Sequence, residues 1–438
     1  MKLWFLVLAF IFSTYAHCQE FNRNKMDSLF SLIDSHDKGM GSISIFADAK
    51  KVYENAIGYA NIEQKIPATP RTKYRIGSIS KTFTANIIMQ LVAENKLPLD
   101  TKLAAFFPEV PNADKITIEQ LLRHKSGIFN FTNDQNYQGY LGQPLTREQM
   151  LEKISVYESV FEPGQKTEYS NSNYVLLSLI AEKIEHKEFA DILVDRICTP
   201  CGLDDTYYGM AISEAREEAR SYTWNKTWQD ATETDMSIPM GAGALVSNPN
   251  DLNRFLNCLF TQNLVSETTL KQMMNMENGM GIGMFQVPFY EKRGFGHNGG
   301  IDGFQTAAYF FPEEKVAISY FSNGVVMGVN DILIGALSIY FGRNYELPGF
   351  PPALELSAED LDPYLGVYSS STFPLKITIT KQGNSLIGQA TGQPTFPLEA
   401  FEPNKFRFEA AGLKLEFKPA DNKMILNQGG GEFELNRE

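Results

Sequence analysis

Ser78 and Lys81 are the residues of this chain whose types and spacing could produce a nucleophile. Residues three apart in a helix share one face, so the Lys81 amine can approach the Ser78 oxygen. The unsatisfied amide groups and the positive dipole end of a helix's first turn favour negative charge that develops on that oxygen. An amine beside a serine hydroxyl is one arrangement that activates serine for covalent catalysis. The pair therefore predicts a serine nucleophile.

The surroundings of Ser78 distinguish it from a second serine and lysine at the same spacing, Ser35 and Lys38. Ser78 follows a strand-to-turn segment, residues 73–77, and opens an apolar run of helical periodicity, residues 83–91. Ser35 instead lies in a polar stretch. Taken alone, the pair at Ser78 would also fit a simple helix cap and an ordinary exposed lysine. The rest of the chain decides between these interpretations.

The size and composition of the chain indicate a globular protein of two domains. It has 438 residues, of which 43% are hydrophobic and 21% charged. The formal net charge is −13, the pI is about 5.1, and no cluster of lysine and arginine is long enough to follow a phosphate backbone. Nucleic acid is therefore not expected as a partner. No acidic or histidine cluster suggests a metal site, and no organic cofactor is implied.

The N-terminal residues predict an export signal. Lys2 precedes an apolar stretch, residues 3–12, which gives way to small and polar residues before Gln19. This stretch is too short to span a membrane as a stable anchor, and no later apolar run reaches that length. We assign residues 1–18 to a signal peptide and expect a periplasmic or secreted protein without a stable membrane anchor.

Three cysteines follow the predicted signal. Cys198 and Cys201 form a Cys-x-x-Cys pair, whose thiols could exchange disulfides in a redox protein. The pair follows a predicted helix and lacks a second cysteine or histidine pair for zinc. A structural or incidental pair is the better interpretation, and its oxidation state stays open. Cys258 is expected to be a small buried side chain on the apolar side of its helix.

The order of the predicted elements indicates an α/β fold for residues 19–346. Strands from both ends of this region should share one antiparallel sheet, with flanking helices and an inserted helical lobe. The serine would lie between the sheet and the lobe. The predicted elements are a helix at 21–33, strands at 42–46 and 52–59, the Ser78 helix, a mainly helical stretch at 97–208, strands at 304–310 and 316–321, and a helix at 330–340.

A change in the sequence pattern near residue 347 predicts a second domain. Residues 347–352 have the proline and glycine content of a linker. Beyond them, residues 354–438 read as short alternating strands separated by turns, which predicts a small all-β barrel of about 85 residues. The predicted strands are 375–380, 385–390, 405–409, 414–418 and 423–427. This barrel could hold a ligand, shape the rim of the active site or mediate self-association.

Two further motifs accompany the serine and lysine. The segment 168–171, Glu-Tyr-Ser-Asn, lies on a loop at a predicted helix start, and the segment 296–300, Gly-His-Asn-Gly-Gly, lies just ahead of a predicted strand. With Ser78 and Lys81, these motifs in this order resemble the serine β-lactamase and penicillin-binding protein superfamily. The resemblance is to the branch that contains class C β-lactamases, D-alanyl-D-alanine carboxypeptidases, D-amino-acid peptidases and related esterases. It covers residues 21–343.

Additional segments support the resemblance. Residues 122–128 look like the family's Leu-x-His-x-Ser-Gly segment, and residues 241–247 are similar to its glycine-rich stretch. The C-terminal region is similar to the lipocalin-like barrels that some members carry. Several motifs in order are more specific than any one of them. The resemblance implies a β-lactamase-like sandwich with a helical lobe, followed by the barrel.

The resemblance implies a role for each motif residue. Ser78 would attack a carbonyl and form an acyl-enzyme, while Lys81 and Tyr169 share the transfer of its proton to the leaving group. A tyrosine can act as a base only if its pKa falls well below about 10, and nearby cations would be the cause. Lys81 and His297 are the candidate cations.

The remaining site residues would bind substrate. The backbone amides of Ser78 and Gly300 would form the oxyanion hole, and Asn171 would hold a substrate amide or the Lys81 amine. The segment 297–299, His-Asn-Gly, which contains His297 and Gly299, occupies the position where many lactam-hydrolysing relatives have Lys-Thr-Gly. A histidine is mostly neutral near pH 7, so it holds a substrate carboxylate less firmly than a lysine does. Strong β-lactamase activity is therefore not expected. His124 is expected to be structural.

The expected function is that of an exported serine hydrolase with D-alanyl-D-alanine carboxypeptidase or D-amino-acid peptidase character. A carboxylesterase or a weak β-lactamase of the same family is the alternative, because one acyl-enzyme scheme opens peptides, esters and lactams. A penicillin-binding or peptide-binding module without turnover is an alternative of another class. The expected partner is a small-molecule or peptide substrate. The sequence predicts neither the substrate nor the oligomeric state.

Overall fold

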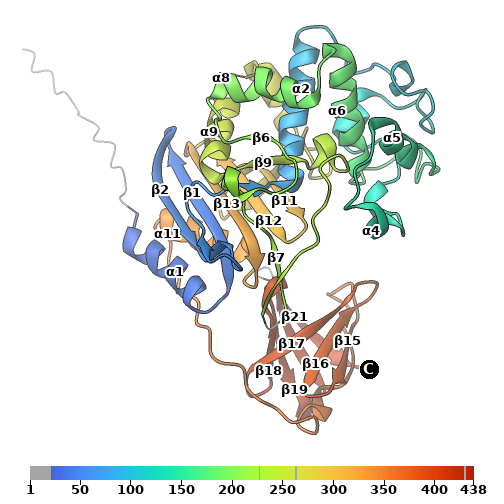
Figure 1. Ribbon diagram of the computed structural model, residues 1–438. Coiled ribbons are helices and arrows are strands. Elements are labelled where there is room, and N and C mark those ends of the chain that lie inside the picture. Colours follow the sequence, from blue (N-terminus) through green and yellow to red (C-terminus); the bar gives the residue numbers. More distant parts are fainter. Residues whose placement is uncertain (1–20, 226, 262–263, 429–430) are drawn as a thin grey trace, which may run out of the picture.

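The computed structural model describes residues 21–225, 227–261, 264–428 and 431–438, and it shows an α/β body followed by a separate β-barrel (Figure 1). The predicted signal peptide, residues 1–18, lies outside the described residues. Within them, no helix combines the length and the apolar character that crossing a bilayer requires.

One sheet organises the α/β body. Its strands follow the order β10-β11-β12-β13-β1-β2, and these neighbours pair antiparallel; a hairpin, β7-β8, joins the end of β13. Strands from the two ends of the region therefore lie side by side, as the sequence predicts. The strands are β1 (Gly39–Ala47), β2 (Lys50–Ile57), β7 (Tyr222–Trp224), β8 (Trp228–Asp230), β10 (Phe285–Phe289), β11 (Lys292–Ile301), β12 (Phe304–Phe311) and β13 (Val316–Val325).

Helices cover both faces of this sheet. The helices α1 (Arg23–Ser35) and α11 (Val329–Tyr340) bury their apolar faces against one side. The helix α9 (Pro249–Phe260) packs on the other, where Phe260 stacks on Phe310 with ring centroids 4.7 Å apart. These layers give the predicted sandwich, because each amphipathic element needs an apolar surface on which to bury its own.

The segments that carry Ser78, Tyr169 and His297 lie where the sheet meets the helical lobe. Its central helix, α2 (Ser80–Ala93), is buried on every side from Ser80 to Leu91, and α6 (Asn171–Glu185) packs against it. A helix that is buried all round sits in the core of a large domain. The short strands β5 (Tyr74–Arg75), β6 (Tyr207–Tyr208) and β9 (Leu245–Ser247) form a separate three-stranded sheet in the order β5-β9-β6. The other lobe helices are α3 (Ile118–Leu122), α4 (Tyr137–Tyr140), α5 (Arg147–Ser155), α7 (Phe189–Leu193), α8 (Thr199–Cys201) and α10 (Glu267–Met274).

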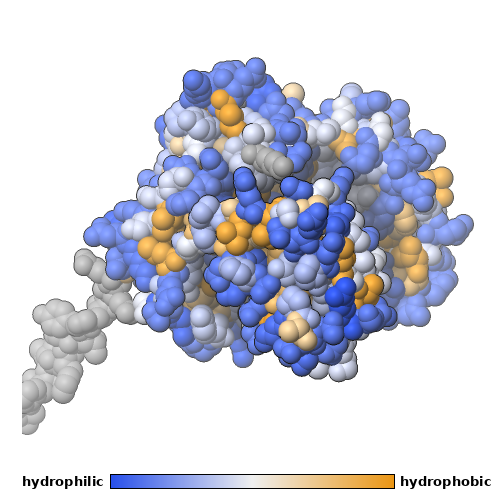
Figure 2. All heavy atoms as spheres, turned by 90° about the horizontal axis from the view of Figure 1, so that it is seen from below, coloured by the Kyte–Doolittle hydropathy of each residue, from blue (hydrophilic) through white to orange (hydrophobic). Residues whose placement is uncertain are grey.

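The C-terminal strands close into an antiparallel barrel, and its interior is filled. Apolar side chains such as Leu386, Phe406 and Leu426 are fully buried inside it, so the barrel has a packed core. From the barrel side, the apolar residues on the surface appear as small separate patches between hydrophilic ones (Figure 2). The strands are β14 (Gly366–Ser369), β15 (Ile377–Gln382), β16 (Ser385–Ala390), β17 (Thr395–Glu402), β18 (Lys405–Phe408), β19 (Leu413–Lys418), β20 (Lys423–Gln428) and β21 (Gly431–Arg437).

Several strands were absent from the sequence prediction. His297 was placed ahead of a strand, but it lies inside β11, next to the unpredicted β10. Four glycines between residues 294 and 300 hide β11, because glycine is rare in strands and carries no alternating pattern. In the barrel, β14, β17 and β21 were likewise missed, and β17 contains Pro397. Pairing with neighbouring strands outweighs these weak local preferences.

Candidate active site

Ser78 lies in a tight 3-10 turn, residues Gly77–Ile79, that leads directly into α2. This turn packs closely against β11. Gly77 has a φ of 52°, and a Cβ placed there would lie 2.9 Å from the Gly300 nitrogen, so only glycine fits. The close approach puts Ser78 and Gly300 on the wall of one cavity of about 660 Å³. The oxyanion-hole prediction for these two amides is compatible with that placement.

Lys81 is completely buried beneath Ser78. Its Nζ atom lies 2.9 Å from Ser78 Oγ, 2.8 Å from Asn171 Oδ1 and 2.7 Å from the Ala242 carbonyl oxygen. Thr132 accepts a hydrogen bond from Asn171 Nδ2, which leaves the amide oxygen of Asn171 facing the amine. The structure therefore brings the predicted Ser78, Lys81 and Asn171 together.

Burial lowers the pKa of Lys81 well below its ordinary value. The three acceptors around the amine are neutral groups, so none of them compensates a positive charge. A neutral amine has two N–H donors and one lone pair. The Asn171 amide oxygen and the Ala242 carbonyl can take the two donors, which directs the lone pair at the Ser78 hydroxyl. This geometry suits a general base that removes the serine proton.

Tyr169 lies on the same nucleophile, but its ionisation differs from the prediction. Its hydroxyl hydrogen-bonds the Ser78 side chain, and its ring centroid is 4.9 Å from the Lys81 nitrogen. Burial raises the pKa of Tyr169, and the hydrogen bond to Ser78 offsets only part of that rise. The expectation that cations lower this pKa is therefore wrong. Tyr169 is a protonated phenol that can donate to an oxygen or relay a proton.

His297 is not the second cation either. It is buried in β11, with the Phe285 ring 4.4 Å and the Tyr169 ring 6.3 Å from its own. Burial and then the Lys81 charge lower the pKa of His297 to about 3. Its Nδ1 atom faces the Asn298 carbonyl oxygen, which only accepts, so Nδ1 carries the proton. The imidazole next to the Tyr169 ring, that of His297, is therefore neutral.

The depressed pKa of His297 predicts a pH dependence of stability. Between pH 6.5 and about 3, the unfolded chain binds a proton at this histidine that the folded chain does not. The free energy of unfolding should therefore fall with pH in this window. Between pH 7 and pH 5, His297→Gln should lose about 2 kcal/mol less than the wild type in urea titrations. His36→Gln, which alters an exposed histidine, is the control, and equal losses in both variants would contradict the prediction.

Gly299 and Gly300 differ in what surrounds them. A Cβ on Gly299 would lie 2.0 Å from the Ile76 carbonyl oxygen, so this glycine lets β11 approach the segment before Ser78. Gly300 faces open space in the cavity. The predicted substrate-binding role therefore fits Gly300 better, while packing alone accounts for Gly299.

His124 is a site residue whose importance the sequence did not reveal. It was expected to be structural, yet its ring stacks on Tyr169 with centroids 4.4 Å apart. Its Nδ1 atom accepts a hydrogen bond from the Ser170 amide, and burial lowers its pKa well below the ordinary value. It thereby holds the tyrosine ring in place as a neutral partner. Its position in the Leu-x-His-x-Ser-Gly segment was the available signal.

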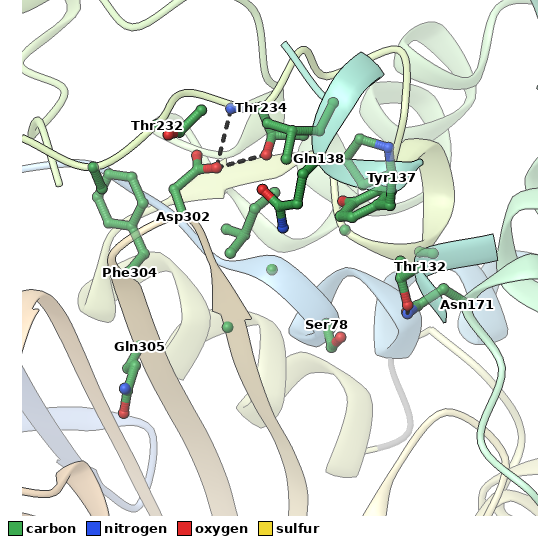
Figure 3. A pocket seen from close by; sticks show the side chains of 18 of the residues that line it. Ser78, Thr132, Tyr137, Gln138, Asn171, Thr232, Thr234, Asp302, Phe304 and Gln305 are labelled. Carbon is green, nitrogen blue, oxygen red and sulfur yellow. Dashed lines mark hydrogen bonds between the residues drawn. The ribbon is translucent and has the colours of Figure 1, made fainter. Parts of the chain in front are cut away.

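A buried ion pair, Arg75 with Asp302, was also missed. Their nitrogen and oxygen atoms are 2.8 Å apart, and both side chains are 2% exposed. Asp302 also accepts hydrogen bonds from the amide and hydroxyl of Thr234 and forms part of the cavity wall (Figure 3). Glu233 pairs with the same arginine, so this group carries a net negative charge. No sequence pattern links these residues.

The charged side chains that line the cavity are both acidic. Asp230 and Asp302 contribute carboxylates, while no lysine, arginine or histidine is among the described lining residues. Tyr137, Gln138 and Thr132 supply neutral polar groups from the lobe (Figure 3). An ammonium group on a substrate would be attracted into this space, whereas a carboxylate would meet no cation.

The cysteines pair differently from the prediction. Cys201 and Cys258 form a disulfide that joins α8 to α9, so Cys258 is not a simple buried thiol. Among the described residues, Cys198 is the free, buried cysteine, and burial raises its pKa to about 12. A thiol that stays protonated is a poor nucleophile, which argues against the redox interpretation of the Cys-x-x-Cys pair.

Removing the disulfide should destabilise the fold. The bridge connects residues 57 apart, so its loss enlarges the conformational freedom of the unfolded chain. The double variant Cys201→Ala, Cys258→Ala should lose about 2 to 4 kcal/mol in the free energy of unfolding, measured by urea titration. Cys198→Ala is the control for cysteine removal. Reductant should lower the wild-type midpoint and leave the double variant unchanged; an unaffected wild type would oppose this account.

Comparisons with known proteins agree with this fold. A beta-lactamase family model matches residues 31–335. Penicillin-binding protein 4* of Bacillus subtilis (strain 168) is 26% identical over 449 aligned residues, covering 95% of this chain and 98% of that protein. Teichoic acid D-alanine hydrolase of Staphylococcus aureus is 23% identical over 322 aligned residues, covering 71% of this chain and 77% of that protein.

Solved structures are similar as well. An octameric penicillin-binding protein homologue from Pyrococcus abyssi superposes with a TM-score of 0.67 at 25% identity and covers 94% of this chain and 99% of its own. D-amino acid amidase from Ochrobactrum anthropi SV3 gives a TM-score of 0.61 at 25% identity, over 71% of this chain and 99% of its own. Because the family model spans most of the polypeptide, including the segments that carry Ser78, Lys81, Tyr169 and His297, the chain belongs to the beta-lactamase family.

Proposed function

We propose that the protein is an exported serine hydrolase that forms an acyl-enzyme on Ser78 and releases D-amino acids, D-alanine above all, from ester or amide linkage. The observation that carries this proposal is the buried Lys81 amine, 2.9 Å from Ser78 Oγ and surrounded by neutral acceptors. Among its relatives, the beta-lactamase-family proteins named D-alanine hydrolase and D-amino acid amidase support the choice of substrate.

The proton steps follow from the contacts of Ser78. Its hydroxyl proton passes to the neutral Lys81 amine as the oxygen attacks the substrate carbonyl. The amides of Ser78 and Gly300 are the proposed donors to the resulting oxyanion. Tyr169 then gives its proton to the leaving oxygen or nitrogen and recovers one from Lys81. For deacylation, the same pair takes a proton from water, which attacks the ester carbonyl and restores Ser78.

The charge of the cavity favours a D-aminoacyl group with a free ammonium over a peptide that ends in a carboxylate. Asp230 and Asp302 lie on its wall, and the neutral His297 replaces the lysine that could hold a carboxylate. This observation makes a D-amino-acid esterase or aminopeptidase the first candidate. A D-alanyl-D-alanine carboxypeptidase is the second, because the Bacillus subtilis relative, which covers 95% of this chain, is named a penicillin-binding protein.

The disulfide supports export. Bridges such as Cys201 to Cys258 persist in oxidising compartments and are rare in the cytosol. Removal of the predicted signal, residues 1–18, would leave a hydrolase region of residues 19–346 and a barrel region of residues 354–438. We propose a periplasmic or secreted location on these grounds.

A substrate panel on the chain without residues 1–18 tests the proposal. Its members are D-alanine methyl ester, L-alanine methyl ester, D-alaninamide, N-acetyl-D-alanyl-D-alanine and a chromogenic cephalosporin. We expect turnover of the D-alanine ester to exceed that of the L-ester and of the carboxylate peptide by at least about tenfold. Intact-protein mass spectrometry should find the acyl adduct on the peptide that contains Ser78.

Each other result has a defined meaning. Preference for N-acetyl-D-alanyl-D-alanine would replace the first candidate by the carboxypeptidase. Labelling by a fluorescent penicillin without turnover of any substrate would point to the binding module. Absence of any adduct at Ser78 would refute the proposed hydrolase.

A further inference from the structure

A second cavity, of about 400 Å³, lies on the opposite face of β11 and β12 from His297, and both bodies of the protein line it. The sheet contributes Asn298, Gln305 and Tyr309. The start of α11 contributes Asn330 and Asp331, and the barrel contributes residues that include Gly412 and Gln428. Neither body forms this cavity alone, so the barrel creates a space that the hydrolase region would otherwise lack.

The two cavities meet at Gln305. This residue lines both of them, and it is the strand partner of Gly300 across β11 and β12. In Figure 3, the Gln305 side chain extends from the start of β12 away from the cluster around Asp302. Gln305 is therefore the side chain that the two cavities share.

Contacts between the two bodies fix the barrel wall of this cavity. Lys38, just before β1, pairs with Glu409 at 2.7 Å, and both side chains are only 14% exposed. Next to this pair, Gly412 packs so closely on Asp331 that an added Cβ would lie 2.8 Å from a carboxylate oxygen. A partly buried ion pair and a close packing contact hold the wall at a defined distance from the sheet.

The chemistry of the lining suits hydroxyl groups. Asn298, Gln305 and Asn330 are exposed, and within the described residues their side-chain amides form no hydrogen bond with the protein, so their donors and acceptors are open to solvent or to a ligand. An amide can both donate and accept, as a hydroxyl does, and the Asp331 carboxylate adds an acceptor. Tyr309 is half-buried and presents an aromatic ring. No lysine or arginine is among the described lining residues, and Lys414, which interacts with the Asp331 carboxylate, lies outside the lining.

We propose that this cavity is a leaving-group subsite for a saccharide, so that the substrate is a D-aminoacyl ester of a sugar chain. The inference rests on the proposed acylation of Ser78 by the D-aminoacyl group. The acyl part would occupy the catalytic cavity, and the sugar part would lie across Gln305 against the free amides, with the Tyr309 ring available to a pyranose face. The barrel then acts in substrate recognition through its contact surface, since its interior is packed.

Two esters that share an acyl group test the subsite. The full chain without residues 1–18 is assayed with D-alanine methyl ester and with 6-O-D-alanylmaltotriose. The sugar ester should have the lower KM, and Asn330→Ala and Asn298→Ala should each raise that KM about three- to tenfold, as the loss of one hydrogen bond allows. Both variants should keep kcat/KM for the methyl ester within about twofold. Asn24→Ala, an exposed amide on α1 outside both cavities, is the matched control.

Binding without turnover separates this inference from the proposed function. Calorimetry with maltotriose and the Ser78→Ala protein should detect binding that Asn330→Ala weakens by a similar factor. Turnover of the methyl ester with equal KM values for both esters, unaffected by either variant, would overturn the subsite alone. No acyl transfer from any ester, with maltotriose still bound, would overturn the proposed function and leave a saccharide-binding cavity.

Discussion

Replacing Ser78 by alanine should lower kcat/KM for D-alanine methyl ester at least about 10⁴-fold and abolish the acyl adduct. The substitution removes the only atom that can form the acyl bond. It leaves the rest of the site in place, because the hydrogen bonds that the structure shows for the Ser78 side chain are those with the Lys81 amine and the Tyr169 hydroxyl. Hydrolysis rates and intact mass measure the two effects.

The chain supplies its own control for this substitution. Ser35 belongs to the second Ser-x-x-Lys and is exposed at the end of α1, far along the chain from the catalytic cluster. Ser35→Ala should keep wild-type kinetics. An acyl adduct on the Ser78→Ala protein, or a loss of activity shared by both variants, would show that another residue is the nucleophile or that the loss has a general cause.

Lys81→Met should reduce the rate of acylation about 10²- to 10⁴-fold, the range typical for loss of a general base. Methionine retains an unbranched apolar stem in the buried site and introduces no charge there. The effect should fall on kcat, with KM little changed, because Lys81 contacts the nucleophile and lies beneath the cavity instead of lining it. Lys102→Met, at an exposed lysine that hydrogen-bonds a backbone carbonyl, is the control.

The pH profile distinguishes loss of a base from loss of packing. In the wild type, kcat/KM should rise with pH as the buried amine loses its proton and then level off, since burial holds the pKa of Lys81 below its ordinary value. The rising limb that belongs to Lys81 should vanish in Lys81→Met, whose residual rate reflects oxyanion stabilisation. A variant that keeps the full limb at reduced height would assign the base to another group.

The elements with strong periodicity could be predicted from the sequence, and so could the residues that carry motifs. The helices at both ends of the hydrolase region and the strands of residues 42–46, 304–310 and 316–321 follow their patterns. Ser78, Lys81, Tyr169 and Asn171 come together because their motifs lie at the N-terminal ends of α2 and α6, which pack against each other. In β11, by contrast, glycines remove the alternation of side chains by which a strand is predicted. The strand is identified from its pairing in the sheet, for example with β12.

Protonation states and long-range pairs could not be predicted in this way. The sequence suggested that cations would lower the pKa of Tyr169, but the depth of the site discharges those cations and raises that pKa instead. The Cys201 to Cys258 bridge and the Arg75 to Asp302 pair join residues with no shared motif. Such features depend on distance and burial in three dimensions, which a linear pattern does not encode.

Because α2 is buried in the core, the activity of the site depends on intact packing around this helix. Burial, and not a neighbouring charge, lowers the pKa of the Lys81 amine, so any opening of the lobe that admits water would raise that pKa and weaken the amine as a base for Ser78. A loosened molecule would thus lose hydrolytic power before it lost its overall shape. Because α2 supports Ser78, hydrolytic activity depends on tight packing around that helix. An exported chain would therefore become active only once its folding was complete.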